Sequence, residues 1–240
     1  IQHMSLKEVK IYMDELSQSL MSELNCETVF TLPIFGGIPI LESVVVTWII
    51  MAFVFIVCVL LTRKLSVEQP TRRQIVLEGA VSWLYNFFKG IMSESCTCYI
   101  PYLMAVVTYI AISNLIGIIG FKPPTKDMNV TIALAVMSIV LIEISGIRQK
   151  GTGGWLKSFA QPSPVVLPIN ILEIFIKPLS LCMRLFGNVL GSFVIMELLK
   201  IICPVFLPAV FSLYFDIFDG LIQAYVFVFL TALFIKEAVE

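Results

Sequence analysis

The stretch that decides the fold is INILEIFIKPLSLCMRLFGNVLGSFVIMELLKIIC, residues 169–203. It contains one internal proline, Pro178, and Pro204 separates it from a second apolar stretch at residues 205–235. As helices the two stretches would be roughly 52 and 46 Å long. Fitting them into a bilayer core of about 30 Å by tilting alone requires roughly 50°. We therefore predict a long, strongly tilted helical hairpin over residues 169–235; the alternative is two ordinary spans joined by loops that the apolar pattern conceals.

Composition places the whole chain in a membrane. Of its 240 residues, 58% are hydrophobic and only 14% are charged, with a mean hydropathy of +0.95. A soluble domain is about half apolar and about a quarter charged, so an ordinary soluble enzyme, a disordered chain and a nucleic-acid binder are excluded. The formal net charge of −1 gives no attraction to polyanions. We predict one membrane domain over residues 1–240.

Three shorter apolar segments precede the hairpin, within residues 41–147. They lie at residues 41–61, 99–119 and 128–147. The length of each segment is close to that of a helix crossing a hydrocarbon core, about 20 residues. Together with the hairpin they predict an all-α membrane protein with about five membrane helices.

The segments around these spans are less apolar. An outer tail, residues 1–40, contains helical apolar spacing that predicts an interfacial amphipathic helix over residues 5–31, followed by a turn at residues 35–39. Residues 75–92 have the pattern of a second helix on the membrane surface, and residues 148–168 read as a polar loop rich in glycine and proline.

Basic residues in the loops orient the chain. The loop after the second span carries only Lys122 and Lys126, and the hairpin tip carries none. The segments after the first and third spans carry far more, and by the positive-inside rule they face the cytoplasm. The N-terminus is then outside and the C-terminus is cytoplasmic. The basic residues of these two segments are Arg63, Lys64, Arg72, Arg73, Lys89, Arg148, Lys150 and Lys157.

Ionisable side chains inside the first long stretch call for a reason, because each costs roughly 3 kcal/mol at membrane depth on insertion scales. Glu173, Lys177 and Arg184 fall within about 20° of one helical line, and Asn188 lies about 40° from it. Ser180 belongs to a set of small residues that allows another helix to approach closely. Arginine stays protonated at any reachable pH, so Arg184 indicates a mechanism that needs an unvarying positive charge.

The second long stretch provides complementary groups. Asp216, Asp219 and Gln223 sit at positions i, i+3 and i+7, which place them on one face of an α-helix. Glu143 adds an acid in the third span, and Asn114 adds a polar side chain in the second. Because such groups can hydrate and pair across the hairpin, they are candidates for an ion path.

Each candidate also has a plainer interpretation. Glu173 would be favoured by the helix dipole if it lies in a first turn, and Lys177 would be tolerated if its ammonium snorkels to the interface. The two aspartates would serve as mere salt-bridge partners of Arg184. The six cysteines and the lone histidine, His3, form no metal-ligand pattern, so we expect no metal ion and no cofactor.

The residues around Arg184 resemble a known family. Lys177-Pro178-Leu179-Ser180-Leu181 followed by Arg184-Leu185-Phe186-Gly187-Asn188 is similar to subunit a of the F-type ATP synthase, the membrane stator subunit. Three further segments resemble the same family in matching order, and the resemblance covers roughly residues 41–235. They are Pro124-Thr125-Lys126-Asp127-Met128-Asn129-Val130-Thr131, Gly151-Thr152-Gly153-Gly154, and Gln223-Ala224-Tyr225-Val226-Phe227 with Leu230-Thr231.

This resemblance implies a role for each matching position. Arg184 would be the stator arginine that faces the rotating ring of c subunits, with Asn188 and Gln223 as its polar neighbours. Asp216 falls where the family often has an ionisable residue in the outer half-channel. Phe193 stands where the family often has Glu or His, so we expect the outer path to be lined differently, by Asp216 with Asp219 and Glu143.

The resemblance also implies the setting. The chain would be a non-catalytic, proton-translocating subunit in a bacterial plasma membrane. Its partners would be the c-ring, the peripheral-stalk subunit b and, through the stalk, the F1 sector, and it would bind no nucleic acid. No GxxxxGK[ST] loop is present, so ATP chemistry would occur elsewhere. The alternatives are the same role with Na⁺ as the coupling ion, or an independent secondary transporter, for which the expected internal repeat is missing.

Overall fold

The structure, a computed structural model, describes residues 28–32, 38–63, 65–66, 70–92, 94–119, 122–159, 166–202 and 211–239. Five helical segments in this part of the chain are long and apolar enough to cross a membrane. They are Glu42–Thr62, Glu94–Ile118, Met128–Ser158, Leu167–Met196 and Phe211–Val239. The predicted all-α membrane fold with about five membrane helices is therefore confirmed.

The element boundaries follow the apolar pattern closely. A helix satisfies every backbone polar group within its own segment, which is why even the valine- and isoleucine-rich first span is helical in a membrane protein. The elements are β1 (Thr28–Leu32), β2 (Ile38–Leu41), α2 (Glu42–Thr62), α3 (Arg72–Ile91), η1 (Glu94–Tyr99), α4 (Ile100–Leu115), η2 (Ile116–Ile119), η3 (Pro124–Lys126), α5 (Met128–Ser158), α6 (Leu167–Ile202), η5 (Tyr214–Asp219) and α8 (Gly220–Val239).

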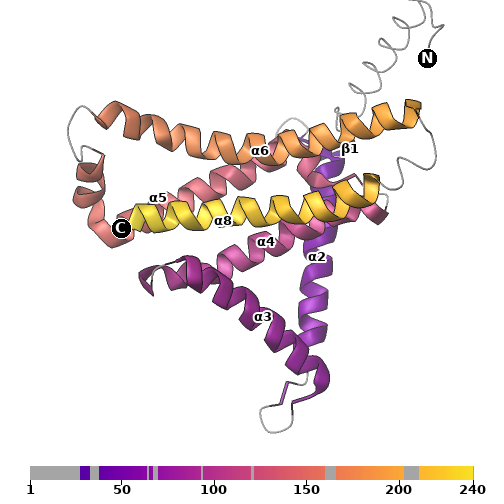
Figure 1. Ribbon diagram of the computed structural model, residues 1–240, viewed down its shortest axis with the longest axis horizontal. Coiled ribbons are helices and arrows are strands. Elements are labelled where there is room, and N and C mark those ends of the chain that lie inside the picture. Colours follow the sequence, from indigo (N-terminus) through magenta and orange to yellow (C-terminus); the bar gives the residue numbers. More distant parts are fainter. Residues whose placement is uncertain are drawn as a thin grey trace, which may run out of the picture.

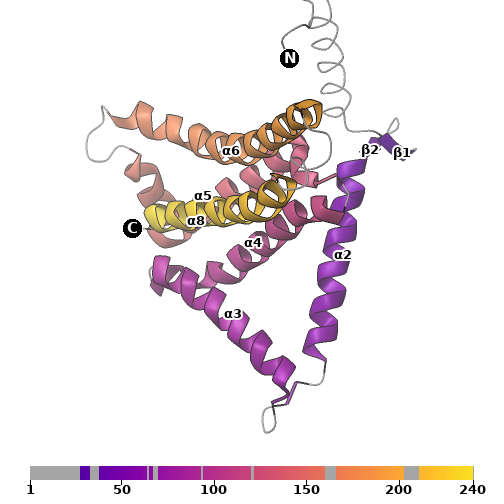
Figure 2. The same ribbon diagram turned by 45° about the vertical axis from the view of Figure 1, so that its right-hand side comes forward.

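The long helices lie side by side, whereas α2 stands steeply across them (Figure 1). α5 packs against both α6 and α8, and α4 packs against α8. These four helices share one core, to which Ile110 of α4, Ile142 of α5, Leu185 of α6 and Phe227 of α8 contribute buried side chains. α2 and α3 splay apart from this group of helices, as the turned view shows (Figure 2).

The predicted hairpin consists of two long antiparallel helices. α6 runs for 36 residues with Pro178 in its interior, and α8 returns beside it in the opposite direction (Figure 1). The residues at the tip, 203–210, lie outside the described part of the chain. The hairpin begins two residues earlier than predicted, at Leu167, and ends four residues later, at Val239.

Two predictions about the connecting segments are wrong. Residues 28–31 are not the end of a surface helix: they belong to β1, which pairs with β2 as an antiparallel ladder, and Ile38 and Pro39 are strand residues rather than part of a turn. The β-branched and aromatic content of TVFTL favours a strand. The expected interfacial helix over residues 5–27 lies outside the described residues.

The second wrong prediction is the polar loop that was expected to begin at Arg148. Helical structure instead continues to Ser158, interrupted only at Gly151, whose φ of +72° breaks the helix and lets a short helical segment turn off in a new direction. Glycine adopts a positive φ without the steric penalty of other residues, so a single residue redirects the chain where the sequence predicts a long loop.

One short turn, η3, and the residue that follows it, Asp127, hold several helices together. Thr125 Oγ1 donates a hydrogen bond to Asn114 Oδ1 of α4 at 2.8 Å, and Ser43 Oγ of α2 donates to Asp127 Oδ2 at 2.5 Å. The other carboxylate oxygen of Asp127 caps the first turn of α5. Thr125 and Asp127 are buried, so these bonds replace the water that the polar groups have lost.

Candidate functional site

Arg184 lies on α6 and its side chain is exposed. Its neighbours Leu181, Cys182 and Leu185 are buried against the rest of the molecule, and Cys182 Sγ lies 3.5 Å from Thr131 Oγ1 of α5. Among the side chains that the structure describes, which do not include that of Asp216, none forms an ion pair or hydrogen bond with Arg184. The guanidinium is thus held on a firmly packed helix, yet open to a group from outside the chain.

On one side of Arg184, polar contacts join α6 to the start of the C-terminal helix. Asn188 Nδ2 donates a hydrogen bond to Asp219 Oδ2 at 2.5 Å. Ser192 Oγ lies 3.5 Å from the same oxygen and donates to the Asn188 backbone carbonyl at 2.9 Å. The structure therefore brings together Asn188 and Asp219 across the hairpin, and it adds Ser192 to this contact.

This contact also sets the level of Gln223. Arg184 precedes Asn188 by one turn of α6, and Gln223 follows Asp219 by one turn of α8. Because the two helices are antiparallel, both residues lie roughly 6 Å from the Asn188–Asp219 contact in the same direction. The side chain of Gln223 is buried, and its Nε2 has no hydrogen-bond partner in the described part of the chain. An unpaired buried amide at this level marks a place where a further polar group would be stabilised.

The backbone that carries the two aspartates departs from the expected α-helix. Residues Tyr214–Asp219 form a π-helical turn, so the α-helical spacing that placed Asp216, Asp219 and Gln223 on one face does not hold through this segment. Such turns are rare and often occur at functional sites. The side chain of Asp216 lies outside the described part of the structure.

The end of the π turn is held by α4. Asn114 Nδ2 donates a hydrogen bond to the Gly220 carbonyl at 2.9 Å, while Asn114 Oδ1 accepts from Thr125. A Cβ atom at Gly220 would lie only 2.9 Å from Asn114 Cβ, so the approach of the two helices requires glycine here. Asn114 stands out in the sequence as a polar residue of the second span, but nothing in the sequence points to Thr125 as its partner.

On the other side of Arg184, a lysine bridges the hairpin. Lys177 Nζ lies 3.4 Å from Glu173 Oε2 and 3.3 Å from Glu237 Oε2 of α8, and 5.2 Å from the centroid of the Phe234 ring. Ser180, between Lys177 and Arg184, is exposed. Glu237 was missed because its partner is 60 residues away in the sequence and no local pattern links them.

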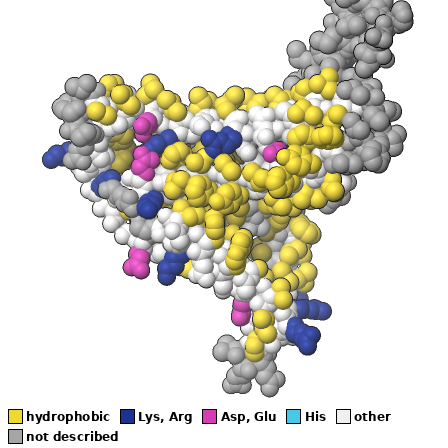
Figure 3. Space-filling view, in the orientation of Figure 1, with side chains coloured by type: hydrophobic (Ala, Val, Ile, Leu, Met, Phe, Trp, Pro, Cys, Tyr) yellow, Lys and Arg dark blue, Asp and Glu magenta, His cyan; other side chains and the backbone are white. Residues whose placement is uncertain are grey.

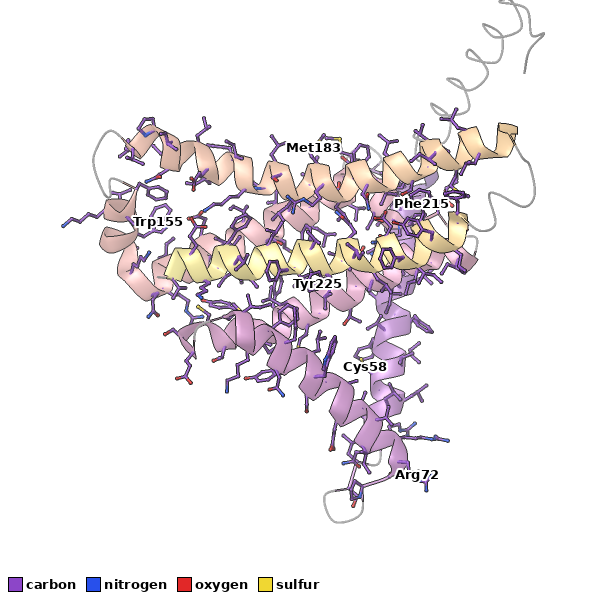
Figure 4. The ribbon with its side chains drawn as sticks, viewed as in Figure 1. Cys58, Arg72, Trp155, Met183, Phe215 and Tyr225 are labelled. Carbon is purple, nitrogen blue, oxygen red and sulfur yellow. The ribbon has the colours of Figure 1, made fainter. Side chains whose placement is uncertain are left out.

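The charged side chains of this region are few on an otherwise apolar surface. In the space-filling view they lie along the band between α6 and α8, with hydrophobic side chains around them (Figure 3). Met183 and Tyr225, both exposed, point outward from these two helices (Figure 4). The charged groups of α6 and α8 are therefore bordered by exposed apolar side chains on this face (Figure 3).

Glu143 does not lie with the aspartates. Its carboxylate accepts a hydrogen bond from Trp155 Nε1 at 2.9 Å. Glu143 precedes Gly146 by three residues, and Gly146 packs against Ala238 near the end of α8. Asp219 is 19 residues before Ala238, so the two acids are separated by roughly 24 Å along the helices. The expectation that Glu143 lines one path with Asp216 and Asp219 is not met.

Phe193, at the position where an acid or histidine was expected from the resemblance, faces a cation. Lys126 Nζ of η3 lies 3.9 Å from the centroid of its ring. A cation over an aromatic face is a favourable contact when it is shielded from water. Phe193 thus contacts η3 without supplying an ionisable group itself.

Known proteins are similar to this sequence over most of its length. The family described as ATP synthase A chain matches residues 44–236. ATP synthase subunit a of Moorella thermoacetica is 39% identical over 206 residues, covering 85% of this chain and 94% of that protein. The corresponding subunit of Legionella pneumophila is 35% identical over the same share of this chain and 89% of its own length. A relative named "ATP synthase subunit a, sodium ion specific", from Propionigenium modestum, is 30% identical over 219 residues, 85% of this chain and 75% of that protein. With its fixed cation between two polar contacts of a long helical hairpin, this chain belongs to the family of ATP synthase subunit a.

Proposed function

We propose that the chain works as the ion-translocating stator subunit of the ATP synthase membrane sector. It provides two aqueous half-channels that carry ions to and from the carboxylates of a rotating c-ring, and it performs no ATP chemistry itself. The observation that supports this most directly is the position of Arg184. It is an exposed, permanent cation with polar contacts between α6 and α8 on both sides of it.

The two sides of Arg184 correspond to the two half-channels in this proposal. Asn188, Asp219 and Gln223 line the outer one, together with Asp216 of the π turn. Glu173, Lys177 and Ser180 border the inner one. The Asn188–Asp219 contact and the unpaired amide of Gln223 support a polar path that reaches Arg184, because both place polar groups one turn or less from its level.

Arg184 separates the two paths electrostatically. A fixed positive charge favours the ionised form of a nearby carboxylate, so a c-ring carboxyl that arrives at Arg184 releases its proton. The same charge repels a cation that would cross directly from one half-channel to the other. Each unit charge that completes the passage gains about 2.3 kcal/mol per 100 mV of membrane potential, and this energy drives the ring.

The surface around Arg184 suits a helical partner in the membrane. Ile176 and Met183 are exposed on α6 within about 100° of Arg184 around the helix axis, and Tyr225 is exposed on α8. This apolar face is the surface that we assign to the c-ring. Subunit b and, through it, the F1 sector are the further partners of this assignment.

We propose the bacterial plasma membrane as the location, with the N-terminus outside and the C-terminus in the cytoplasm. The excess of basic residues in the first and third loops supports this orientation. Protons are the proposed coupling ion. ATP hydrolysis by the assembled complex, measured with and without sodium, distinguishes protons from sodium, because only a sodium-coupled complex requires the added ion.

Replacement of Arg184 tests the proposal. Arg184→Ala in the assembled complex, reconstituted into vesicles, is expected to abolish ATP-driven ion pumping because the separating charge is lost. Arg73→Ala removes an exposed arginine of α3 and serves as the matched control, which should pump normally. Pumping by the Arg184→Ala complex at the rate of the control would contradict the stator role.

A further inference from the structure

Glu143 is an intramembrane acid that the proposed ion path leaves without a part. It is half-buried on α5, far from Asp219, and its carboxylate Oε2 accepts the indole N–H of Trp155 at 2.9 Å. Trp155 lies beyond Gly151, in the short segment that turns away from the main axis of α5 (Figure 4). The acid therefore links the body of α5 to the segment that follows the break.

The contact continues from Trp155 to the start of α6. The Trp155 ring meets Phe159 edge to face, with centroids 4.8 Å apart. The backbone carbonyl of Phe159 accepts a hydrogen bond from Asn170 Nδ2, in the first turns of α6, at 2.9 Å. The chain of contacts thus runs from Glu143 through Trp155 and Phe159 to the helix that carries Arg184.

Close packing keeps Trp155 in this place. A Cβ atom at Gly146 would lie 3.4 Å from Trp155 Cδ1 and 3.2 Å from the Ala238 carbonyl oxygen. The absence of a side chain at Gly146 therefore lets the indole and the end of α8 approach α5 together. The two other tryptophans of the chain, Trp48 and Trp83, are half or more exposed, which is usual for tryptophan at the surface of a membrane helix.

We propose that Glu143 is a positioning residue, not an ion carrier: it anchors the segment after Gly151 through Trp155, and so sets where α6 begins relative to α5. A carboxylate acceptor makes a stronger hydrogen bond to an indole N–H than a neutral acceptor does. An anchor of this kind needs only an oxygen acceptor at residue 143, whereas an ion carrier needs a group that binds and releases the ion.

Glu143→Gln separates these two requirements, because the amide keeps an oxygen acceptor but does not titrate. The parent for the test is the full complex carrying Trp48→Phe and Trp83→Phe, in which Trp155 is the single tryptophan of this chain. Ultraviolet resonance Raman spectra of the reconstituted membrane sector, compared with a Trp155→Phe sample, report whether the indole N–H is hydrogen-bonded. ATP-driven pumping is measured in the same preparations, and this parent must pump like the unmodified complex.

We expect Glu143→Gln to retain the hydrogen-bonded indole signal and to pump like the parent. Glu143→Leu should lose the signal, and hydrogen exchange at residues 152–158 should become about tenfold faster, as the loss of one charge-assisted hydrogen bond predicts. Glu143→Leu and Trp155→Phe should each slow pumping, and the double variant should be no slower than either one.

Two outcomes would overturn the proposal. Loss of pumping in Glu143→Gln with the indole signal intact would show that residue 143 must titrate. An unchanged signal in Glu143→Leu would show that the contact is absent. Neither result depends on Arg184, whose replacement in the same parent tests the stator role separately.

Discussion

The close approach of α8 to α4 at Gly220 gives a prediction whose size follows from the structure. A Cβ atom there would lie 2.9 Å from Asn114 Cβ, well inside ordinary contact. Gly220→Ala therefore forces the helices apart, at a cost of about 1–3 kcal/mol for overpacking. Weakening of the buried Asn114–Gly220 hydrogen bond adds about 1–2 kcal/mol. The better helix propensity of alanine returns about 1 kcal/mol.

The net loss of about 1–4 kcal/mol should be visible in thermal unfolding of the purified membrane sector. For a chain of this size, 1 kcal/mol shifts Tm by about 2–4 °C, so a loss near 2 kcal/mol lowers it by about 4–8 °C. Gly79→Ala is the matched control, because Gly79 is an exposed helical glycine of α3 where an added Cβ atom would have no neighbour within 4 Å. Gly79→Ala should leave Tm unchanged or raise it slightly. If Gly220→Ala melts at the same temperature as Gly79→Ala, the reasoning from close approach is refuted.

Three further changes test other contacts. Asn114→Ala leaves Thr125 Oγ1 and the Gly220 carbonyl without their buried partner. It should lower the free energy of unfolding by about 2–3 kcal/mol, measured by denaturing-detergent titration, and a loss below about 0.5 kcal/mol would contradict the contact. Gly151→Ala should cost about 1–3 kcal/mol, because φ of 72° with ψ of 161° is a backbone conformation that essentially only glycine adopts. Gly153→Ala has room for a Cβ atom and should not be destabilising, so equal melting temperatures of the two variants would refute the difference. Lys177→Glu should slow ATP-driven pumping, because it breaks the ion pair with Glu237 that joins the two hairpin helices. Adding Glu237→Lys restores opposite charges and should restore pumping; a double variant that pumps as slowly as Lys177→Glu would contradict a role for this ion pair.

The membrane helices could be predicted from the sequence because the bilayer imposes simple demands. A segment that must satisfy its own backbone polar groups and cross about 30 Å is identified by length and apolarity alone. The first span was expected at residues 41–61 and begins at Glu42 and ends at Thr62. The hairpin helices could be predicted from the same two properties, because their apolar stretches of 35 and 31 residues exceed the about 20 residues of an ordinary span.

Features that depend on contacts between distant residues were not predictable. The strand Thr28–Leu32 forms because it pairs with the strand Ile38–Leu41, about ten residues away. The helix break at Gly151 depends on the backbone angle of a single residue. The same holds within the site. Arg184 and Asn188 could be chosen from their helical spacing, and Asp219 from its charge inside an apolar stretch. The pairing of Lys177 with Glu237 and of Glu143 with Trp155 required the packed helices. The π turn before Gly220 has no periodic signal, because the apolar pattern continues through it.

The turn η3, with Asp127 after it, also bears on how the length of such a chain can vary. Three successive residues, Thr125, Lys126 and Asp127, contact α4, α6 and α2 respectively. Inserting or deleting one residue here would move at least two of these side chains away from their partners at once, and no local rearrangement could restore all three. Changes of length among related chains should therefore accumulate in the segments on either side of this turn, while the spacing from Thr125 to Asp127 stays the same.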